Sequence, residues 1–325
     1  MLEIIINALL IVIGLSLLFA GSELLIRGSV KIAKRLHVSQ IIIGLTIVAF
    51  GTSTPELIVS VSSALQGQTD ISLGNIIGSN IINIGLILGL SSAIFPIAVH
   101  VKTIRREIPI MLAVSLFIIP ISLDGTISQI EGGLLVISLI AFVYYSYKQS
   151  KKEKNNMELN INDDIDTISN TNKLDFPIIK NIIFIIIGIA LLYVGSKFTI
   201  DNAVSIANIF GISERIIGLT IIAIGTSLPE LVTSVRAALK KHADLSIGNI
   251  IGSNIFNVLE ILGISSLIVG IKVNSEIFID YIVMMGFSLV LIPLMRSGFM
   301  ISKKEGYILT GAYISYLIFL LITLK

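Results

Sequence analysis

Two copies of one short motif, Gly-Thr-Ser-x-Pro-Glu, combine side chains that could act together as oxygen ligands. The copies occupy 51–56 and 225–230. Their polar members are Thr52, Ser53 and Glu56 in the first copy, and Thr226, Ser227 and Glu230 in the second. Helical spacings of three and four residues place each set on one face. The proline cannot donate a hydrogen bond to the carbonyl four residues earlier, so it bends the helix and frees that oxygen. Each motif therefore offers hydroxyl, carbonyl and carboxylate oxygens.

A second repeated motif, Gly-Asn-Ile-Ile-Gly-Ser-Asn, follows each of the first, at 74–80 and 248–254. Spacings of four residues put Ser79 on one face with Asn83, and Ser253 on one face with Asn257. These four side chains would add hydroxyl and amide oxygens to the same site, the alternative being simple hydrogen bonding between helices. For the glycines, close helix packing is the expected role.

An oxygen-only ligand set with two carboxylates favours a hard cation. Calcium accepts about six to eight oxygens in flexible geometry, whereas magnesium demands a stricter octahedron and keeps its waters. Backbone carbonyls and hydroxyls also suit sodium. The chain has no cysteine, and its three histidines, His37, His100 and His242, fall in or near expected loops. No side chains are therefore placed to select zinc or copper, and no resident cofactor is expected.

The composition places these motifs in a membrane. Of the 325 residues, 54% are hydrophobic and 14% are charged, against about 25% charged in a typical soluble protein. The first apolar run lacks a basic leading region and a small-residue cleavage site, so it is expected to be a transmembrane helix rather than a signal peptide. We therefore predict an all-α polytopic membrane protein. The ten apolar segments are expected at 3–26, 41–65, 71–95, 104–123, 129–147, 178–199, 214–239, 245–269, 277–296 and 304–324.

Two buried acids in such a protein need a partner. Placing a carboxylate at membrane depth costs roughly 2.5–3.5 kcal/mol even on insertion scales, and two that face each other also repel. A cation between Glu56 and Glu230 removes both costs. The alternative is that each glutamate is protonated or bonded to a neighbouring helix.

The positive charges predict the orientation of the segments. A polar stretch at 148–177 is expected to be a flexible linker. Of the 23 lysines and arginines, 19 fall in this linker and the other loops that follow odd-numbered segments. By the positive-inside rule these loops are cytoplasmic and both termini face outward.

An internal repeat predicts the architecture. When the sequence is shifted by 174 residues, 43–92 aligns with 217–266 without a gap, with 32 identities in 50 positions. Each half, 1–147 and 178–325, holds five expected segments. An odd number reverses the second half in the membrane, which gives two inverted five-helix repeats with a site where they meet.

The paired motifs resemble the cation/calcium exchanger superfamily, specifically its prokaryotic sodium/calcium exchangers, over the whole chain. The resemblance implies an antiporter of the cytoplasmic (inner) membrane in which Na⁺ and Ca²⁺ compete for one central site while the first and sixth helices slide across a static core. It also implies the full ligand set. On this sequence the ligands are Ala49 (carbonyl), Thr52, Ser53, Glu56, Ser79, Asn83, Ala223 (carbonyl), Thr226, Ser227, Glu230, Ser253 and Asn257.

Three departures from the family pattern bear on the coupling ion and on regulation. Some relatives carry an aspartate where this chain has Asn83 or Asn257, so the site here has two carboxylates. Glu260 stands where the first repeat has Leu86; it would either add a second carboxylate layer or lie protonated at a helix interface. The linker is too short for the folded regulatory calcium-binding domains of animal exchangers.

The sequence thus predicts a calcium/sodium antiporter working by alternating access. Proton-coupled antiport of calcium or another divalent cation is the alternative. An ion channel usually needs an oligomeric pore, whereas both halves of this site lie in one chain, so a monomer should function. A membrane enzyme would need a nucleophile or cofactor motif, which is missing. The expected partners are calcium and sodium ions and the lipid bilayer, with no nucleic acid.

Overall fold

The computed structural model describes residues 2–36, 38–161, 178–210 and 223–323, and these are mostly helical. Labels with η denote π-helical turns. The first half contains α1 (Leu2–Leu36), α2 (Gln40–Ile43), η1 (Gly44–Val48), α3 (Ala49–Thr52), α4 (Thr54–Leu65), α5 (Thr69–Ile82), η2 (Asn83–Leu88), α6 (Gly89–Ile94), β1 (Ile97–Ala98), α7 (Val101–Arg105), α8 (Glu107–Ile121), β2 (Thr126–Ile127) and α9 (Gln129–Ile161). The second half contains α10 (Ile178–Ile209), α12 (Ala223–Thr226), α13 (Leu228–Leu239), α14 (Ala243–Phe256), η4 (Asn257–Leu262), α15 (Gly263–Val269), β3 (Ile271–Lys272), α16 (Ile277–Arg296), β4 (Met300–Ile301) and α17 (Lys303–Thr323).

Within the described residues, six helices are long and apolar enough to cross a membrane. A seventh span results if the helices on either side of Ser53, which meet at a bend of 47°, are counted as one. The other predicted segments correspond to α8, which has 15 residues, to α17, and to the α12–α13 region. Residues 214–222 of that last segment lie outside the described part of the chain.

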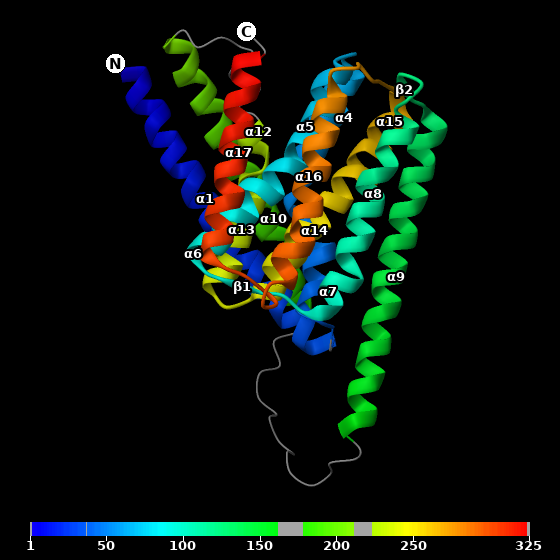
Figure 1. Ribbon diagram of the computed structural model, residues 1–325. Helices are drawn as coiled ribbons and strands as arrows, with labels where there is room; N and C mark the ends of the chain where they lie inside the picture. Colours follow the sequence, from blue (N-terminus) through cyan, green and yellow to red (C-terminus); the bar gives the residue numbers. More distant parts are fainter. Residues whose placement is uncertain (1, 37, 162–177, 211–222, 324–325) are drawn as a thin grey trace.

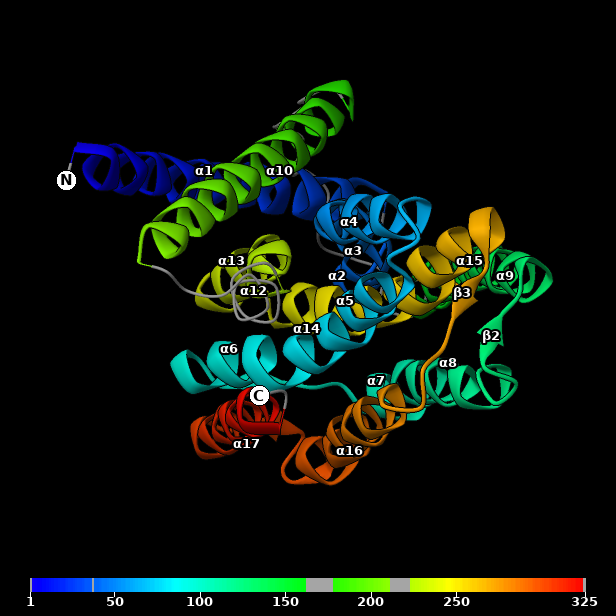
Figure 2. The same ribbon diagram turned by 90° about the horizontal axis from the view of Figure 1, so that it is seen from above.

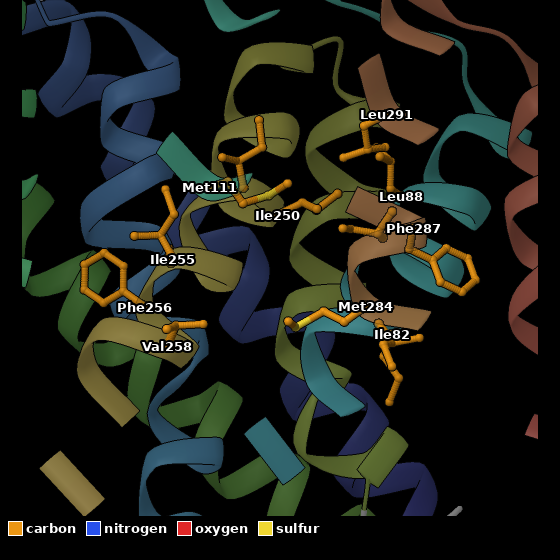
Figure 3. Close-up of a cluster of buried hydrophobic side chains, with 14 of the residues drawn as sticks. Ile82, Leu88, Met111, Ile250, Ile255, Phe256, Val258, Met284, Phe287 and Leu291 are labelled. Atoms are coloured by element: carbon orange, nitrogen blue, oxygen red, sulfur yellow. The ribbon is translucent and has the colours of Figure 1, made fainter. Parts of the chain in front are cut away.

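Two continuous helices form the centre of the molecule. The Thr69–Ile94 and Ala243–Val269 helices are 78% and 89% buried along their apolar windows, whereas α1, α9, α10 and α16 are 22–28% buried. Apolar side chains from both halves pack around these central helices (Figure 3). The outer helices expose their apolar side chains, as expected of helices that face lipid.

α1 and α10 form an antiparallel pair along one edge of the molecule (Figure 2). Glycines at seven-residue intervals bring the two backbones together: a Cβ at Gly14 would lie 2.9 Å from the carbonyl oxygen of Gly195, and one at Gly21 would lie 2.8 Å from that of Gly188. The contact moves toward the C-terminus of α1 as it moves toward the N-terminus of α10, so the first helices of the two halves run in opposite directions.

The helices around the repeated motifs have the same lengths in both halves, and each short strand of one half pairs with a strand of the other. α4 and α13 have 12 residues each, and α5 and α14 have 14 residues each. β1 pairs with β4, and β2 pairs with β3. The shift of 174 residues converts the first strand pair into the second. The sequence did not predict these strands, because strands of two residues leave no periodic pattern.

The described chain begins and ends at the same end of the molecule. α1 begins and α17 ends at one end of the molecule, while α9 extends beyond the other end (Figure 1). This arrangement agrees with termini on one side, although which side is cytoplasmic stays a prediction. α9 also continues through Ile161 into the stretch predicted to be a flexible linker, because residues 148–161 are rich in good helix formers such as lysine, glutamate and glutamine. Residues 162–177 of that linker lie outside the described part.

Close packing at Gly252 gives a first prediction. A Cβ there would lie 2.7 Å from Ala49 Cβ and from the carbonyl oxygen of Leu45. The change Gly252→Ala should therefore force α14 away from η1 and α3, which costs on the order of 1–3 kcal/mol. We expect a lower midpoint of thermal unfolding in detergent. Gly311→Ala is the matched control, since a Cβ there meets nothing within 4 Å; equal midpoints for the two variants would contradict this packing.

Candidate ion-binding site

Both Gly-Thr-Ser-x-Pro-Glu motifs break their helices at the serine. The backbone of Ser53 has φ −80° and ψ 6°, and that of Ser227 has φ −86° and ψ 6°. In each case the proline stands in the first turn of the following helix, where its missing N–H is tolerated. The carbonyl of Gly225, which Pro229 cannot reach with a hydrogen bond, accepts one from Ser196 Oγ of α10 at 2.8 Å. The predicted bend is thus a true break that turns the serine toward the other half.

Each buried acid is bonded to the serine of the other half. Ser53 Oγ donates to Glu230 Oε1 at 2.8 Å, and Ser227 Oγ donates to Glu56 Oε1 at 2.9 Å. Both carboxylates are 1% exposed. The 174-residue shift converts one bond into the other. The two acids therefore meet where the halves join, rather than on separate lipid-facing surfaces.

Two asparagines that the sequence prediction left out complete the junction. Thr52 Oγ1 donates to Asn249 Oδ1 at 3.1 Å, and Asn249 Nδ2 donates to Ser234 Oγ at 3.0 Å.

The other half repeats this arrangement. Thr226 Oγ1 donates to Asn75 Oδ1 at 3.3 Å, and Asn75 Nδ2 donates to Ser60 Oγ at 2.9 Å. Each threonine is therefore oriented by an asparagine of the opposite half. The signal was available in the sequence, since both asparagines belong to the second repeated motif.

One predicted serine of the central helices reaches an acid directly, and the other reaches the serine that bonds the second acid. Ser253 Oγ donates to Glu230 Oε1 at 3.4 Å, and Ser79 Oγ lies 3.3 Å from the Oγ of Ser227, which bonds Glu56. Six predicted ligands are therefore in hydrogen-bond contact, as two groups of three: Glu230 with Ser53 and Ser253, and Glu56 with Ser227 and Ser79. Thr52 and Thr226 bond instead to Asn249 and Asn75.

The predicted asparagines each begin a π-helical turn. Asn83 is the first residue of η2 and Asn257 the first of η4, and both are 1% exposed. Asn257 Nδ2 donates to Asn80 Oδ1 of the other half at 3.0 Å. π-turns inside helices are frequent at functional sites, and here they interrupt the two most buried helices of the chain.

Ala49 and Ala223 entered the predicted ligand set by resemblance alone. The carbonyl of Ala49 accepts a hydrogen bond from the Ser53 N–H at 2.9 Å and one from Thr52 Oγ1 at 3.3 Å. Ala223 is the first residue of α12, directly after the gap in the described chain. Their roles as ligands stay predictions.

Four buried oxygens among the predicted ligands have no hydrogen-bond partner within the described residues. They are the Oε2 atoms of Glu56 and Glu230 and the Oδ1 atoms of Asn83 and Asn257. All four are acceptors, and they form two pairs related by the repeat. Leaving such groups without a partner is costly, and a cation would supply one. The described residues contain no cluster of three or more His, Cys, Asp or Glu side chains, so hydroxyls and amides must complete any coordination sphere.

A pair of buried acids surrounded by hydroxyl and amide oxygens, at the junction of two similar halves of an apolar helical protein, is the arrangement of a secondary cation transporter. The sequence pattern that defines the family "Sodium/calcium exchanger protein" matches residues 6–148 and 180–322. The chain belongs to this sodium/calcium exchanger family, which is a family of membrane antiporters.

Known relatives match over nearly the full length. The putative antiporter CaxA of Alkalimonas amylolytica is 39% identical over 310 residues, which cover 94% of this chain and 96% of that protein. The sodium/calcium exchanger MaX1 of Methanosarcina acetivorans is 33% identical over 344 residues, with 97% and 98% covered. A structure of the sodium-calcium exchanger NCX_Mj soaked with 10 mM Na⁺ and 10 mM Sr²⁺ superposes with a TM-score of 0.82 at 32% identity, with 97% and 98% covered.

Glu260 lies apart from the reciprocal bonds. It belongs to η4 and is 5% exposed, and within the described residues its carboxyl forms no hydrogen bond or ion pair. Gly263, one turn further on, packs against Leu135 and Val136 of α9, so the face with Glu260 is directed toward α9. This geometry favours a position of Glu260 at the interface between helices over a role in a second layer of carboxylate ligands.

We therefore predict that Glu260→Leu, which installs the residue of the first repeat, leaves sodium-driven calcium uptake close to that of the unmodified protein. The measurement is calcium-45 uptake into proteoliposomes at several pH values, because transport coupled to protons would change with the proton concentration. A collapse of uptake in this variant would place Glu260 in the transport reaction and favour proton coupling.

Proposed function

We propose that the protein exchanges calcium for sodium across the cytoplasmic membrane by alternating access. One Ca²⁺ would bind between Glu56 and Glu230, and several Na⁺ would displace it from the same set of oxygens when the site opens to the other side. The observation that carries this proposal is the reciprocal bonding of each acid to the serine of the other half. A site shared in this way changes whenever one half moves against the other.

The proposed architecture is ten transmembrane helices in two inverted five-helix repeats. The antiparallel course of α1 and α10, the matched lengths of α4 with α13 and α5 with α14, and the exchange of β1–β4 with β2–β3 under the repeat shift all support it. The termini would lie outside and the linker in the cytoplasm, as the distribution of positive charges predicts.

Charge neutralisation explains why such a carrier would exchange ions rather than leak. Two unneutralised carboxylates in a low-dielectric site are costly, so the empty carrier should cross between states slowly. One Ca²⁺ or several Na⁺ would remove that cost and allow the crossing. This chemistry needs no nucleophile and no resident cofactor, in keeping with a transporter rather than an enzyme.

The test is calcium-45 uptake into proteoliposomes loaded with Na⁺ and diluted into Na⁺-free buffer. We expect uptake that depends on the outward Na⁺ gradient and is lost when K⁺ replaces Na⁺ inside. The rival function is proton-coupled antiport, because the buried acid Glu260 could carry a proton. Calcium uptake that is driven by a pH jump in the absence of Na⁺, and that does not respond to Na⁺, would favour this rival. Saturable counterflow of unlabelled calcium would separate either carrier from a channel.

A further inference from the structure

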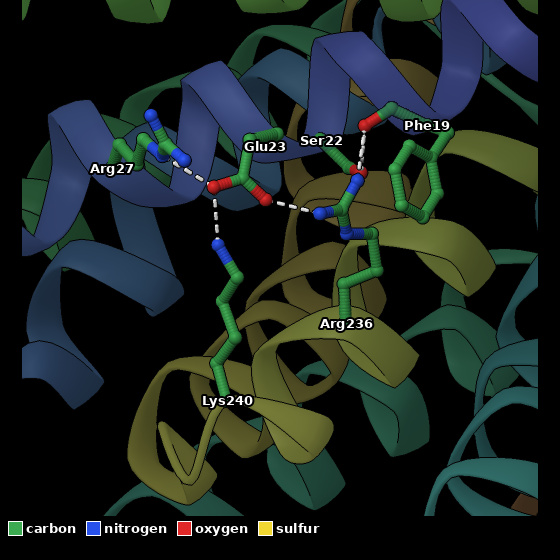
Figure 4. A network of polar contacts seen from close by, with 6 residues as sticks. All are labelled: Phe19, Ser22, Glu23, Arg27, Arg236 and Lys240. Atoms are coloured by element: carbon green, nitrogen blue, oxygen red, sulfur yellow. Dashed lines mark hydrogen bonds and ion pairs between the residues drawn. The ribbon is translucent and has the colours of Figure 1, made fainter.

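An ion-pair network fastens α1 to the C-terminal end of α13 (Figure 4). Glu23 of α1 is paired with Arg236 of α13 and with Lys240, the residue directly after α13. It also pairs with Arg27, one turn further along α1. Arg236 donates to the carbonyl oxygen of Phe19 and stacks on the Phe19 ring, with its guanidinium carbon 3.5 Å from the ring centroid.

This network is better shielded than an ordinary surface ion pair. The side chains of Glu23 and Arg236 are 17% and 12% exposed. Exposed isolated pairs contribute little, whereas networks with low exposure and a stacked guanidinium contribute more. Since α13 begins two residues before Glu230, the network connects α1 to a helix that carries one of the two acids.

The other half has no charges at the equivalent positions of its second helix. The shift of 174 residues relates Glu23 to Lys197 on α10. It relates Arg236 to Ser62 on α4, and Lys240 to Gln66, the residue directly after α4. Gln66 Nε2 instead donates to Ser62 Oγ, four residues earlier. The ion-paired tie is therefore specific to one of two junctions that the repeat makes equivalent.

The two junctions also differ in the structure. α1 packs along α13, whereas α10 barely touches α4. The α1–α13 junction is therefore tightly packed in this structure, and the α10–α4 junction is loosely packed.

We propose that Glu23, Arg236 and Lys240 form a latch that holds the α1–α13 junction closed and so favours one of the two access states. This inference rests on the alternating access proposed above. In an inverted-repeat transporter the two states exchange the roles of the halves, so a tie at one junction makes the states unequal in free energy. The latched junction lies at the end predicted to be cytoplasmic, and the favoured state is the one open to the outside.

Distances between spin labels test the latch directly, because the chain has no cysteine of its own. Labels on Leu65→Cys and Ile209→Cys would sit on exposed positions at the ends of α4 and α10. In ion-free proteoliposomes we expect one dominant long distance with the latch intact. Opening the latch should add a shorter distance, as the α10–α4 junction closes in the opposite state.

Two variants should shift the populations in the same direction for different reasons. Arg236→Gln with Lys240→Gln removes the tie. Gln66→Glu leaves the tie intact, removes only the exposed bond to Ser62, and places a carboxylate where Lys197 can pair with it once the opposite junction closes. Each should raise the ratio of the short to the long distance by roughly five- to thirtyfold, the range of a moderate interaction. Lys304→Gln, an exposed lysine at the start of α17, is the control and should change nothing.

An unchanged distance distribution in the double glutamine variant would overturn the latch. The Gln66→Glu variant covers the case in which the double glutamine variant does not fold, because Gln66 is exposed and its replacement should not disturb folding. An unchanged distance distribution in Gln66→Glu would then overturn the latch. Calcium-45 exchange on the same vesicles keeps the two proposals apart. If the variants still exchange calcium but the distances between the spin labels do not change, the latch alone is contradicted. If the distances change but the unmodified protein shows no calcium exchange, the antiport function alone is contradicted.

Discussion

Glu56→Gln and Glu230→Gln are each expected to lower sodium-driven calcium uptake by at least about a hundredfold. The amide keeps the size of the side chain and can accept from the serine that bonds each acid, but it cannot hold a negative charge. Mutation of groups that merely orient metal ligands typically costs about 10–100-fold in affinity, so loss of a charged ligand should cost more. Because the repeat relates the two positions, the two variants should be about equally affected.

The measurement is calcium-45 uptake at saturating Na⁺ gradient, with yield and thermal midpoint in detergent as checks on folding. Glu276→Gln, at the start of α16, is a suitable control because this acid is exposed. We expect the control to transport normally and both site variants to remain folded. Near-normal exchange in either site variant would refute the assignment of the acids.

The second large effect is expected at the asparagines that cross-link the halves. Asn249→Leu removes the acceptor of Thr52 and the donor to Ser234, and Asn75→Leu does the same in the other half. Buried polar groups that lose a partner cost about 1–3 kcal/mol each. Because the asparagines orient the threonines without being predicted ligands, calcium affinity should fall by about 10–100-fold.

The control for this pair is Asn202→Ala, whose amide bonds to the Phe198 carbonyl of its own helix. The readout is the calcium concentration for half-maximal uptake, which should rise for both leucine variants while the maximal rate changes less. If the leucine variants behave like the control, the asparagines do not position the site.

The sequence predicted the chemistry of the site better than its detailed shape. Glu56 and Glu230 could be paired in advance because the 174-residue repeat places the same motif in both halves, and an odd number of segments brings them to one depth. The serine-to-acid bonds across the junction were not predictable in this form. Helical spacing suggested that Ser53 and Glu56 act together, whereas the break at Ser53 directs that serine to Glu230 instead.

Other features left no pattern that spacing could reveal. The π-turns at Asn83 and Asn257 arise inside apolar helices whose periodicity looks ordinary. The pairs β1–β4 and β2–β3 depend on contacts between residues far apart in the chain. The network around Glu23 likewise joins α1 to α13 across more than half of the sequence, and its members read locally as ordinary loop-flanking charges.

The most direct test of the central claim is calorimetric titration of the purified protein with calcium at several Na⁺ concentrations. The reciprocal geometry of Glu56 and Glu230 predicts one calcium per chain, and an apparent affinity that weakens more steeply than the first power of the Na⁺ concentration. Binding should vanish in the Glu56→Gln, Glu230→Gln double variant. Calcium binding that is indifferent to Na⁺, or that persists in the double variant, would contradict a shared site between the two acids.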